Sequence, residues 1–278
     1  MPSDSLFAAL GAAPNVILNV LLPLLYFLAS ICVYLLLILQ ISARTSTSVD
    51  EPKRRFGLPE AILAAALIFL LLLNVSASVS NRPVQLNGRN LLEKLLFTLA
   101  VVLFIVAFLR FRGFDLNSLG GFFKITFLRA LSTGIILILA AYPLISLADA
   151  ITRRLFGNGS SKQSIVELFS GSRTIEQRIM IVVFAVAIAP VVEEFLFRFF
   201  LYGVLKRYFG RFLGITVNAL LFAAAHTHFP SFAPLFILGS CFTIAYEWSG
   251  SILVAMTMHS LFNSVSLTVL AFPELFPQ

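Results

Sequence analysis

The sequence predicts an all-α protein, a polytopic membrane helix bundle with about eight transmembrane helices. Hydrophobic residues make up 59% of its 278 residues and charged residues only 12%, whereas soluble domains are nearer half apolar and a quarter charged. The mean hydropathy is +0.96. Apolar runs of about 20 residues, the length that crosses a bilayer, recur along the chain.

Eight apolar stretches are candidate spanning helices. They lie near residues 15–41, 59–79, 91–110, 125–148, 177–207, 211–227, 231–247 and 250–271. Polar or Gly- and Pro-containing segments separate them, such as Pro230 and the pair Ser249-Gly250. The first run is longer than the apolar region of a signal peptide, so we interpret it as a retained spanning helix. We expect a single membrane domain over 1–278, in which 1–148 holds spanning helices without motifs.

The charge distribution excludes some classes of partner. The net charge of +7 is typical of the Lys and Arg excess in membrane-protein loops. No basic stripe with interleaved aromatic residues is present, so we expect no nucleic-acid partner. Cys32 and Cys241 lie inside apolar runs and lack the spacing of metal ligands.

The positive-inside rule gives a weak orientation, with the N-terminus outside. The inner loops then carry eleven basic residues, namely Arg44, Lys53, Arg54, Arg55, Arg110, Arg112, Lys124, Arg129, Lys206, Arg207 and Arg211. The outer loops carry eight, namely Arg82, Arg89, Lys94, Arg153, Arg154, Lys162, Arg173 and Arg178.

Ionisable residues interrupt the last four apolar stretches, and they are the candidate functional residues. An ionisable side chain at membrane depth costs at least ~2.5–3.5 kcal/mol, so it indicates a functional site by default. Glu194 and Arg198 are four apart, share a helix face and can pair. Glu193 is turned about 100° from Glu194, so the two acids point at different partners. The alternative is a buried ion pair that only fixes the packing of helices.

Histidines and an asparagine complete the candidate set. His259 and Asn263 are four apart, as are Phe222 and His226, so each pair shares a helix face. His228 points away from His226 and fits a loop or interface residue. His259 alone is equally explained as a core histidine that bonds a neighbouring helix. Five such groups on three apolar helices exceed what packing requires.

These residue types suit peptide hydrolysis by an activated water. A Glu in an apolar site can act as general base, and His226 can hold the same water. His259 and Asn263 are suitable hydrogen-bond donors for a developing oxyanion. No Ser or Cys lies in an obvious nucleophile motif. The mechanism needs no cofactor, although two His and one or two Glu would also suit a divalent metal such as Zn²⁺.

Three ordered motifs resemble those of the CAAX prenyl protease 2 family, also called the CPBP group. The motifs are Glu193-Glu194-x-x-x-Arg198, Phe222-x-x-x-His226 and His259-x-x-x-Asn263. The setting Ala189-Pro190-Val-Val-Glu-Glu, with Gly239 and Gly250-Ser251-Ile252 later in the chain, is similar as well. The resemblance covers roughly residues 177–270, which we expect to form a CPBP-like catalytic core.

The resemblance implies an intramembrane endopeptidase of the glutamate type. By position, Glu193 with His226 activates water, His259 and Asn263 form the oxyanion hole, and Glu194 with Arg198 supports them. The family usually has Gly after the motif Arg, where Phe199 stands here. The expected partners are the lipid bilayer and a membrane-associated peptide or protein substrate.

The expected location is the cytoplasmic membrane of a prokaryote. Two other functions stay open at this point. One is a non-catalytic immunity or partner protein of the same fold, and the other is a proton-coupled transporter.

Overall fold

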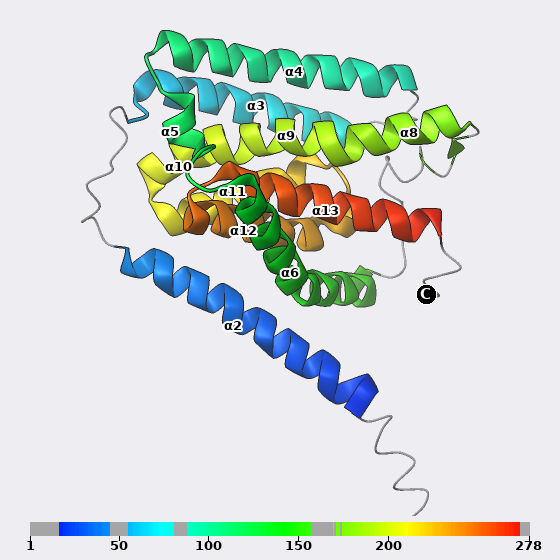
Figure 1. The fold of residues 1–278 in the computed structure, drawn as a ribbon. Coiled ribbons are helices and arrows are strands. Elements are labelled where there is room, and N and C mark those ends of the chain that lie inside the picture. Colours follow the sequence, from blue (N-terminus) through cyan, green and yellow to red (C-terminus); the bar gives the residue numbers. More distant parts are fainter. Residues whose placement is uncertain are drawn as a thin grey trace, which may run out of the picture.

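The computed structural model describes residues 17–44, 55–80, 88–156, 169, 171–172 and 174–272. Within these residues the chain is helical and forms no β-strand. In chain order the elements are η1 (Ile17–Leu21), α2 (Leu22–Ala43), α3 (Leu58–Ser80), α4 (Gly88–Phe111), α5 (Leu116–Gly120), α6 (Phe127–Phe156), α8 (Ile175–Val183), η2 (Phe184–Ile188), α9 (Ala189–Glu194), η3 (Phe195–Leu201), α10 (Tyr202–Phe209), α11 (Arg211–Ala225), η4 (Phe229–Ser231), α12 (Phe232–Ser249) and α13 (Ile252–Ala271). Figure 1 shows that they form one helix bundle.

Six helices of the described residues are long and apolar enough to cross a membrane. They are Leu18–Ala43, Leu58–Ser78, Phe127–Phe156, Ile175–Phe209, Phe229–Ser249 and Ile252–Val269. Of the other two expected stretches, the one near 91–110 lies in α4, whose apolar part among the residues described is Leu95–Phe111, and the one near 211–227 forms the shorter helix Arg211–Ala225. The prediction of an all-helical, multi-pass integral membrane protein is therefore confirmed, with six helices of full spanning length among the residues described.

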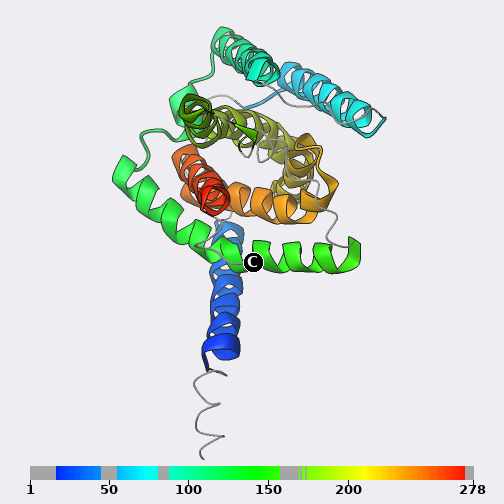
Figure 2. The same cartoon turned by 90° about the vertical axis from the view of Figure 1, so that its right-hand side faces the viewer.

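The core of the bundle lies around α12. Half of the span Phe229–Ser249 is buried, compared with 6% of the span Leu58–Ser78. Helix α12 packs against α2, α6, α11 and α13. Helices α3 and α4 lie on one side of this core and α2 on the other (Figure 2). The outer helices expose many leucine side chains, which hydrocarbon solvates as well as a protein interior does.

The adjacent acids Glu193 and Glu194 lie in one long, irregular helix, Ile175–Phe209. Thr174 caps its start in a capping box with Gln177. Two π-helical segments, η2 and η3, flank the short helix α9. Single π turns inside α-helices are frequent at functional sites. The helix ends at Gly210, whose φ of 78° permits the sharp reversal into α11.

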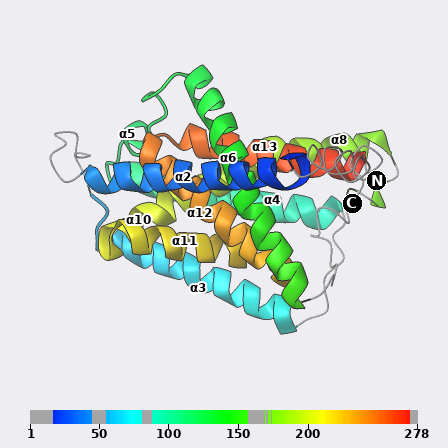
Figure 3. The same ribbon diagram turned by 90° about the horizontal axis from the view of Figure 1, so that it is seen from below.

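A proline in α6 is compensated by α2. Pro143 has no N–H, so the carbonyl of Leu139 loses its usual helix donor. The hydroxyl of Tyr26 donates to that carbonyl, and the hydroxyl of Tyr34 donates to the carbonyl of Leu137 at 2.9 Å. These bonds tie α2 to α6, which it crosses in Figure 3.

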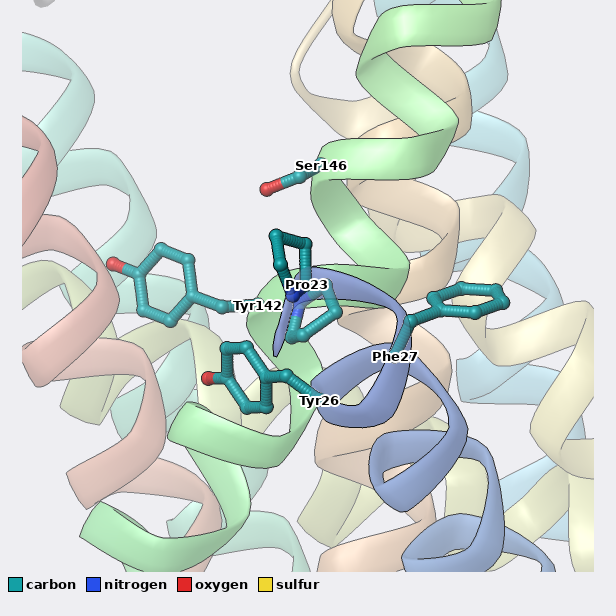
Figure 4. A pocket seen from close by; sticks show the side chains of 6 residues that line it. Pro23, Tyr26, Phe27, Tyr142 and Ser146 are labelled. Atoms are coloured by element: carbon teal, nitrogen blue, oxygen red, sulfur yellow. The ribbon is translucent and has the colours of Figure 1, made fainter. Parts of the chain in front are cut away.

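A crevice of about 310 Å³ lies at this seam between α2 and α6. Its lining consists of Pro23, Tyr26, Phe27, Tyr142, Pro143 and Ser146. In Figure 4 the hydroxyls of Tyr26 and Tyr142 point to the same side of the crevice.

Polar contacts join α2, α10, α11 and α12 at one end of the bundle, which we call the cation-rich end (Arg44, Lys206, Arg211). Arg211 Nη1 donates to the carbonyl of Ile41 at 2.6 Å, and Arg44 Nη1 donates to the carbonyl of Trp248 at 2.6 Å. Glu247 pairs with Lys206 at 2.7 Å and with Arg211 at 2.9 Å. All three cations belong to the set that the positive-inside rule places on the inner side. The side of the membrane itself stays a prediction.

Candidate functional site

Glu194 and Arg198 form a fully buried ion pair. Arg198 Nη1 lies 2.8 Å from Glu194 Oε1, and both side chains are 0% exposed. The spacing i, i+4 along the helix brings them together, as the sequence predicts. The second guanidinium nitrogen, Nη2, donates to the carbonyl of Gly239 at 3.1 Å. The Arg198 side chain therefore links the glutamate helix to α12.

Aromatic rings surround the Arg198 guanidinium. Its central carbon lies 4.3 Å from the ring centroid of Phe222 and 5.2 Å from that of Phe242. Both rings are fully buried. Cation–π attraction is stronger when the cation is desolvated. The same Phe222 ring makes edge contacts with His226 and His259, at centroid distances of 4.7 and 5.8 Å. Phe222 thus contacts Arg198 and both histidines.

His259 connects the ion pair to the second acid. Its Nδ1 lies 2.8 Å from Glu194 Oε1, and its Nε2 lies 3.9 Å from Glu193 Oε2. A carboxylate accepts only, so the Nδ1 of His259 carries a proton. In the neutral ring Nε2 is then an acceptor, and in the doubly protonated ring it is a donor.

Glu193 faces both histidines. Its Oε2 lies 4.0 Å from His226 Nε2 and 3.9 Å from His259 Nε2. That oxygen is buried, whereas the Glu193 side chain as a whole is 31% exposed. The carboxylate therefore lies at the boundary between the protein interior and the outside. The different partners that the 100° offset predicts are confirmed in part: Arg198 pairs with Glu194 and His226 faces Glu193, whereas His259 contacts both acids.

His226 lies at the C-terminal end of α11. Its Nδ1 contacts the carbonyl of Phe222 at 2.8 Å, so Nδ1 donates and Nε2 of the neutral ring accepts. The next residue, Thr227, has a φ of 49°, so the chain turns sharply directly after the histidine. His228 is directed elsewhere, as expected, and contacts Ser231 Oγ at 2.7 Å.

Asn263 is on the same face of α13 as His259, but its amide has a partner that the sequence does not indicate. Asn263 Nδ2 donates to the carbonyl of Ala185 at 2.7 Å. In the π turn η2 the N–H of Ala189 goes to Phe184, and Pro190 has no N–H to offer. The Ala185 carbonyl thereby loses both following helix donors, and Asn263 replaces them.

Several buried polar atoms of the site have no hydrogen-bond partner. They are Glu193 Oε2, Glu194 Oε2 and Arg198 Nε. Buried polar groups are usually satisfied, and a catalytic role is one of the reasons for an exception. Among the residues described, no three His, Cys, Asp or Glu side chains are spaced to hold a metal ion.

Phe199, which replaces the usual glycine of the family, is accommodated by stacking. Its ring lies 4.4 Å from that of Phe195, at an interplanar angle of 17°. The side chain is 2% exposed. It therefore fills the bundle beside the ion pair.

Sequence reasoning missed a buried polar pair next to the site. Asn218 Nδ2 donates to Thr243 Oγ1 at 3.1 Å, and both residues are 0% exposed. The only signal was a lone Asn in the middle of an apolar stretch.

The fold and this cluster define a class: a polytopic membrane protein with a buried acid–histidine site. Residues 175–265 match the family model described as type II CAAX prenyl endopeptidase Rce1-like. The membrane-embedded CAAX protease MroQ of Staphylococcus aureus (strain USA300) is 33% identical over 96 residues, which cover 32% of this chain and 39% of that protein. No solved structure matches the chain. The two matches confirm the resemblance to the CPBP family that the three motifs indicated.

Proposed function

We propose that the chain is an intramembrane endopeptidase of the CAAX prenyl protease 2 type. It hydrolyses a peptide bond in a membrane-associated peptide or protein, using water activated by Glu193. The observation that carries the proposal is the convergence of two histidine Nε2 atoms on Glu193 Oε2, at 3.9 and 4.0 Å. The family match supports the reaction class.

The nucleophile is a water between Glu193 and His226. Their 4.0 Å separation is too long for a direct hydrogen bond and suits one bridging water. Such a water donates one proton to Glu193 Oε2 and the other to His226 Nε2, which accepts because Nδ1 is bound to the Phe222 carbonyl. The lone pairs of the water then face away from both groups, toward a substrate carbonyl carbon.

Proton transfer through Glu193 completes the hydrolysis. As the water oxygen bonds to the carbonyl carbon, its proton moves to Glu193, and the carbonyl oxygen becomes an oxyanion. Glu193 then passes that proton to the departing amine nitrogen as the C–N bond breaks. The products are a new C-terminal carboxylic acid, which releases the second water proton to solvent, and a new amine, and Glu193 regains its charge.

The oxyanion is stabilised by Asn263 and by His259 in its doubly protonated form. His259 then donates through Nε2 while Nδ1 stays bonded to Glu194. The Asn263 amide has two N–H groups and gives one to Ala185, so the second is available. A charged His259 with Arg198 also balances the two carboxylates, which matters because unpaired buried charge is costly.

We also propose a membrane setting for the bundle. We place α4 (Gly88–Phe111) and the shorter helix Arg211–Ala225 in the bilayer with the six candidate spans, which makes eight in all. The cation-rich end faces the cytoplasm in this arrangement.

The reaction needs no metal, so chelators are expected to leave the rate unchanged.

Proteolysis of a reporter peptide by the purified protein in detergent tests the proposal. Glu193→Gln, His226→Ala and His259→Ala are each expected to abolish turnover while the protein remains folded. Glu176→Gln is the matched control, because Glu176 is an exposed acid of the same long helix. It is expected to keep the wild-type rate.

Full activity in all three site variants would sink the proposal. If binding to a partner protein persists in them and no cleavage is seen in the wild type, the chain is a non-catalytic partner protein. Proton-coupled flux in liposomes, lost in Glu193→Gln, would instead indicate a transporter.

A further inference from the structure

A chain of buried hydrogen bonds extends behind Arg198 into α11 and α12. Asn218 Nδ2 donates to Thr243 Oγ1 at 3.1 Å, and Thr243 Oγ1 donates to the Gly239 carbonyl at 2.8 Å. The same carbonyl accepts Arg198 Nη2 at 3.1 Å. Asn218, Thr243 and Arg198 are all 0% exposed, so water does not compete for these bonds.

The order of donors along this chain is determined. A carbonyl cannot donate, so the Thr243 hydroxyl proton is committed to Gly239. The hydroxyl oxygen is then left as acceptor, and the Asn218 amide nitrogen donates to it. Bonds arranged in this head-to-tail order polarise one another in a low-dielectric interior.

Thr243 and Arg198 both reach α12 at the same carbonyl, that of Gly239. Gly239 has no side chain, and a Cβ there would lie 3.0 Å from Phe222 Cδ1. The position therefore lets Phe222 and Arg198 approach α12 together.

We propose that Asn218 and Thr243 are positioning residues of the proteolytic site. They hold the Gly239 carbonyl in place for Arg198, which in turn orients Glu194 and, through it, the ring of His259. This inference rests on the proposed function, because its effect on rate presupposes a proteolytic reaction. Its geometric content, the orientation of His259, does not depend on any reaction.

The test compares Thr243→Val, which removes the hydroxyl but keeps the shape, with Thr243→Ser, which keeps the hydroxyl. Thr243→Val is expected to lower kcat by roughly 10- to 100-fold with little change in KM, since a small misplacement of catalytic groups costs up to about 10²-fold. Thr243→Ser is expected to retain most of the wild-type rate. Thr216→Val is the matched control, because Thr216 makes the same type of bond, to Phe212 at 3.1 Å, on the exposed face of α11.

A second measurement does not need activity. With only three histidines in the chain, ¹⁵N-histidine NMR resolves His259 and reports the bond from its Nδ1 to Glu194. Thr243→Val is expected to move this resonance, whereas Thr216→Val leaves it in place. If Thr243→Val does not fold, Asn218→Ala takes its place in both measurements.

Two outcomes are distinguishable. An unmoved His259 resonance in the folded Thr243→Val protein, together with wild-type kcat, overturns the positioning role. A moved resonance in a protein that cleaves nothing, wild type included, overturns the proposed proteolysis and leaves the positioning of His259 intact.

Discussion

Replacing Arg198 with methionine should destabilise the protein far more than the loss of an ordinary ion pair. Methionine retains much of the packing volume but removes the charge. Glu194 then remains fully buried without its cationic partner at 2.8 Å. Removing one member of a buried pair costs about 3–5 kcal/mol, and here the single charge of His259 is left to offset both Glu193 and Glu194. The variant also leaves the Gly239 carbonyl without its cross-helix donor.

A second substitution separates charge from packing. Arg198→Met combined with Glu194→Gln removes both charges, and replacing a buried pair as a whole is often nearly neutral. The double variant should therefore recover most of the stability lost in Arg198→Met. The coupling between the two sites is read from the double-mutant cycle.

Unfolding in mixed detergent micelles, followed by circular dichroism, measures these differences. The matched control is Arg153→Met, because Arg153 pairs with Asp149 at the same i, i+4 spacing and the same 2.8 Å but is 61% exposed. An exposed pair contributes about 0–1 kcal/mol. If Arg198→Met lowers the free energy of unfolding no more than Arg153→Met does, the buried pair of Arg198 with Glu194 does not stabilise the bundle as argued.

Three further predictions concern other parts of the chain. Gly239→Ala places a Cβ 3.0 Å from the buried Phe222 ring, so overpacking should cost about 1–3 kcal/mol in the same unfolding assay and reduce turnover; unchanged values in both would contradict the packing described. Tyr26→Phe removes the donor to the α6 carbonyl freed by the proline and should cost about 1 kcal/mol, again measured by unfolding. The hydroxyl of Ser118 and two backbone N–H groups donate to Asp115 and hold the pKa of its carboxyl below the usual range. A carboxyl whose pKa is lowered by folding stabilises the folded protein at pH values above its unfolded-state pKa of about 4. That stabilisation is lost as the pH falls through the folded-state pKa. The melting temperature of the wild type should therefore fall in acid, and Asp115→Asn should weaken that dependence; equal slopes for the two proteins would argue against the cap.

Helical spacing was enough to predict the faces on which the site is built. Residues four apart share a face in any regular helix, so the pair of Glu194 with Arg198 was predictable and is confirmed at 2.8 Å. The offset between adjacent residues predicted that Glu193 has other partners; it faces His226, and it shares His259 with Glu194. Local geometry alone determines the pair of Glu194 with Arg198 and the offset of Glu193, but not which histidines Glu193 meets.

The partner of Asn263 was not predictable from spacing. Its bond to Ala185 depends on a π turn, which shifts the hydrogen-bond register of the helix by one residue. No sequence pattern of the chain indicates that turn beyond the proline at position 190. The same limit applies to Asn218 and Thr243, whose contact joins two helices.

The partners of Glu247 at the end of α12 were not predictable either. Tyr246, Glu247 and Trp248 fit an aromatic belt at a membrane interface, but Glu247 pairs with Lys206 and Arg211 as well. Those cations are distant in the sequence and meet Glu247 only because the bundle brings three helix ends together. Helix lengths were similarly uncertain, since the stretch near 211–227 forms a helix of only 15 residues.

The most direct test of the account is the rate at which Glu193→Gln cleaves a reporter peptide in proteoliposomes, relative to Glu176→Gln. Mass spectrometry of the new C-terminus identifies the cleaved bond. Loss of a general base typically costs about 10²–10⁴-fold, so Glu193→Gln should be slower by at least the lower figure while its melting temperature stays close to that of the control. Cleavage of the same bond at equal rates by both variants would contradict the role of Glu193 as the base that activates water.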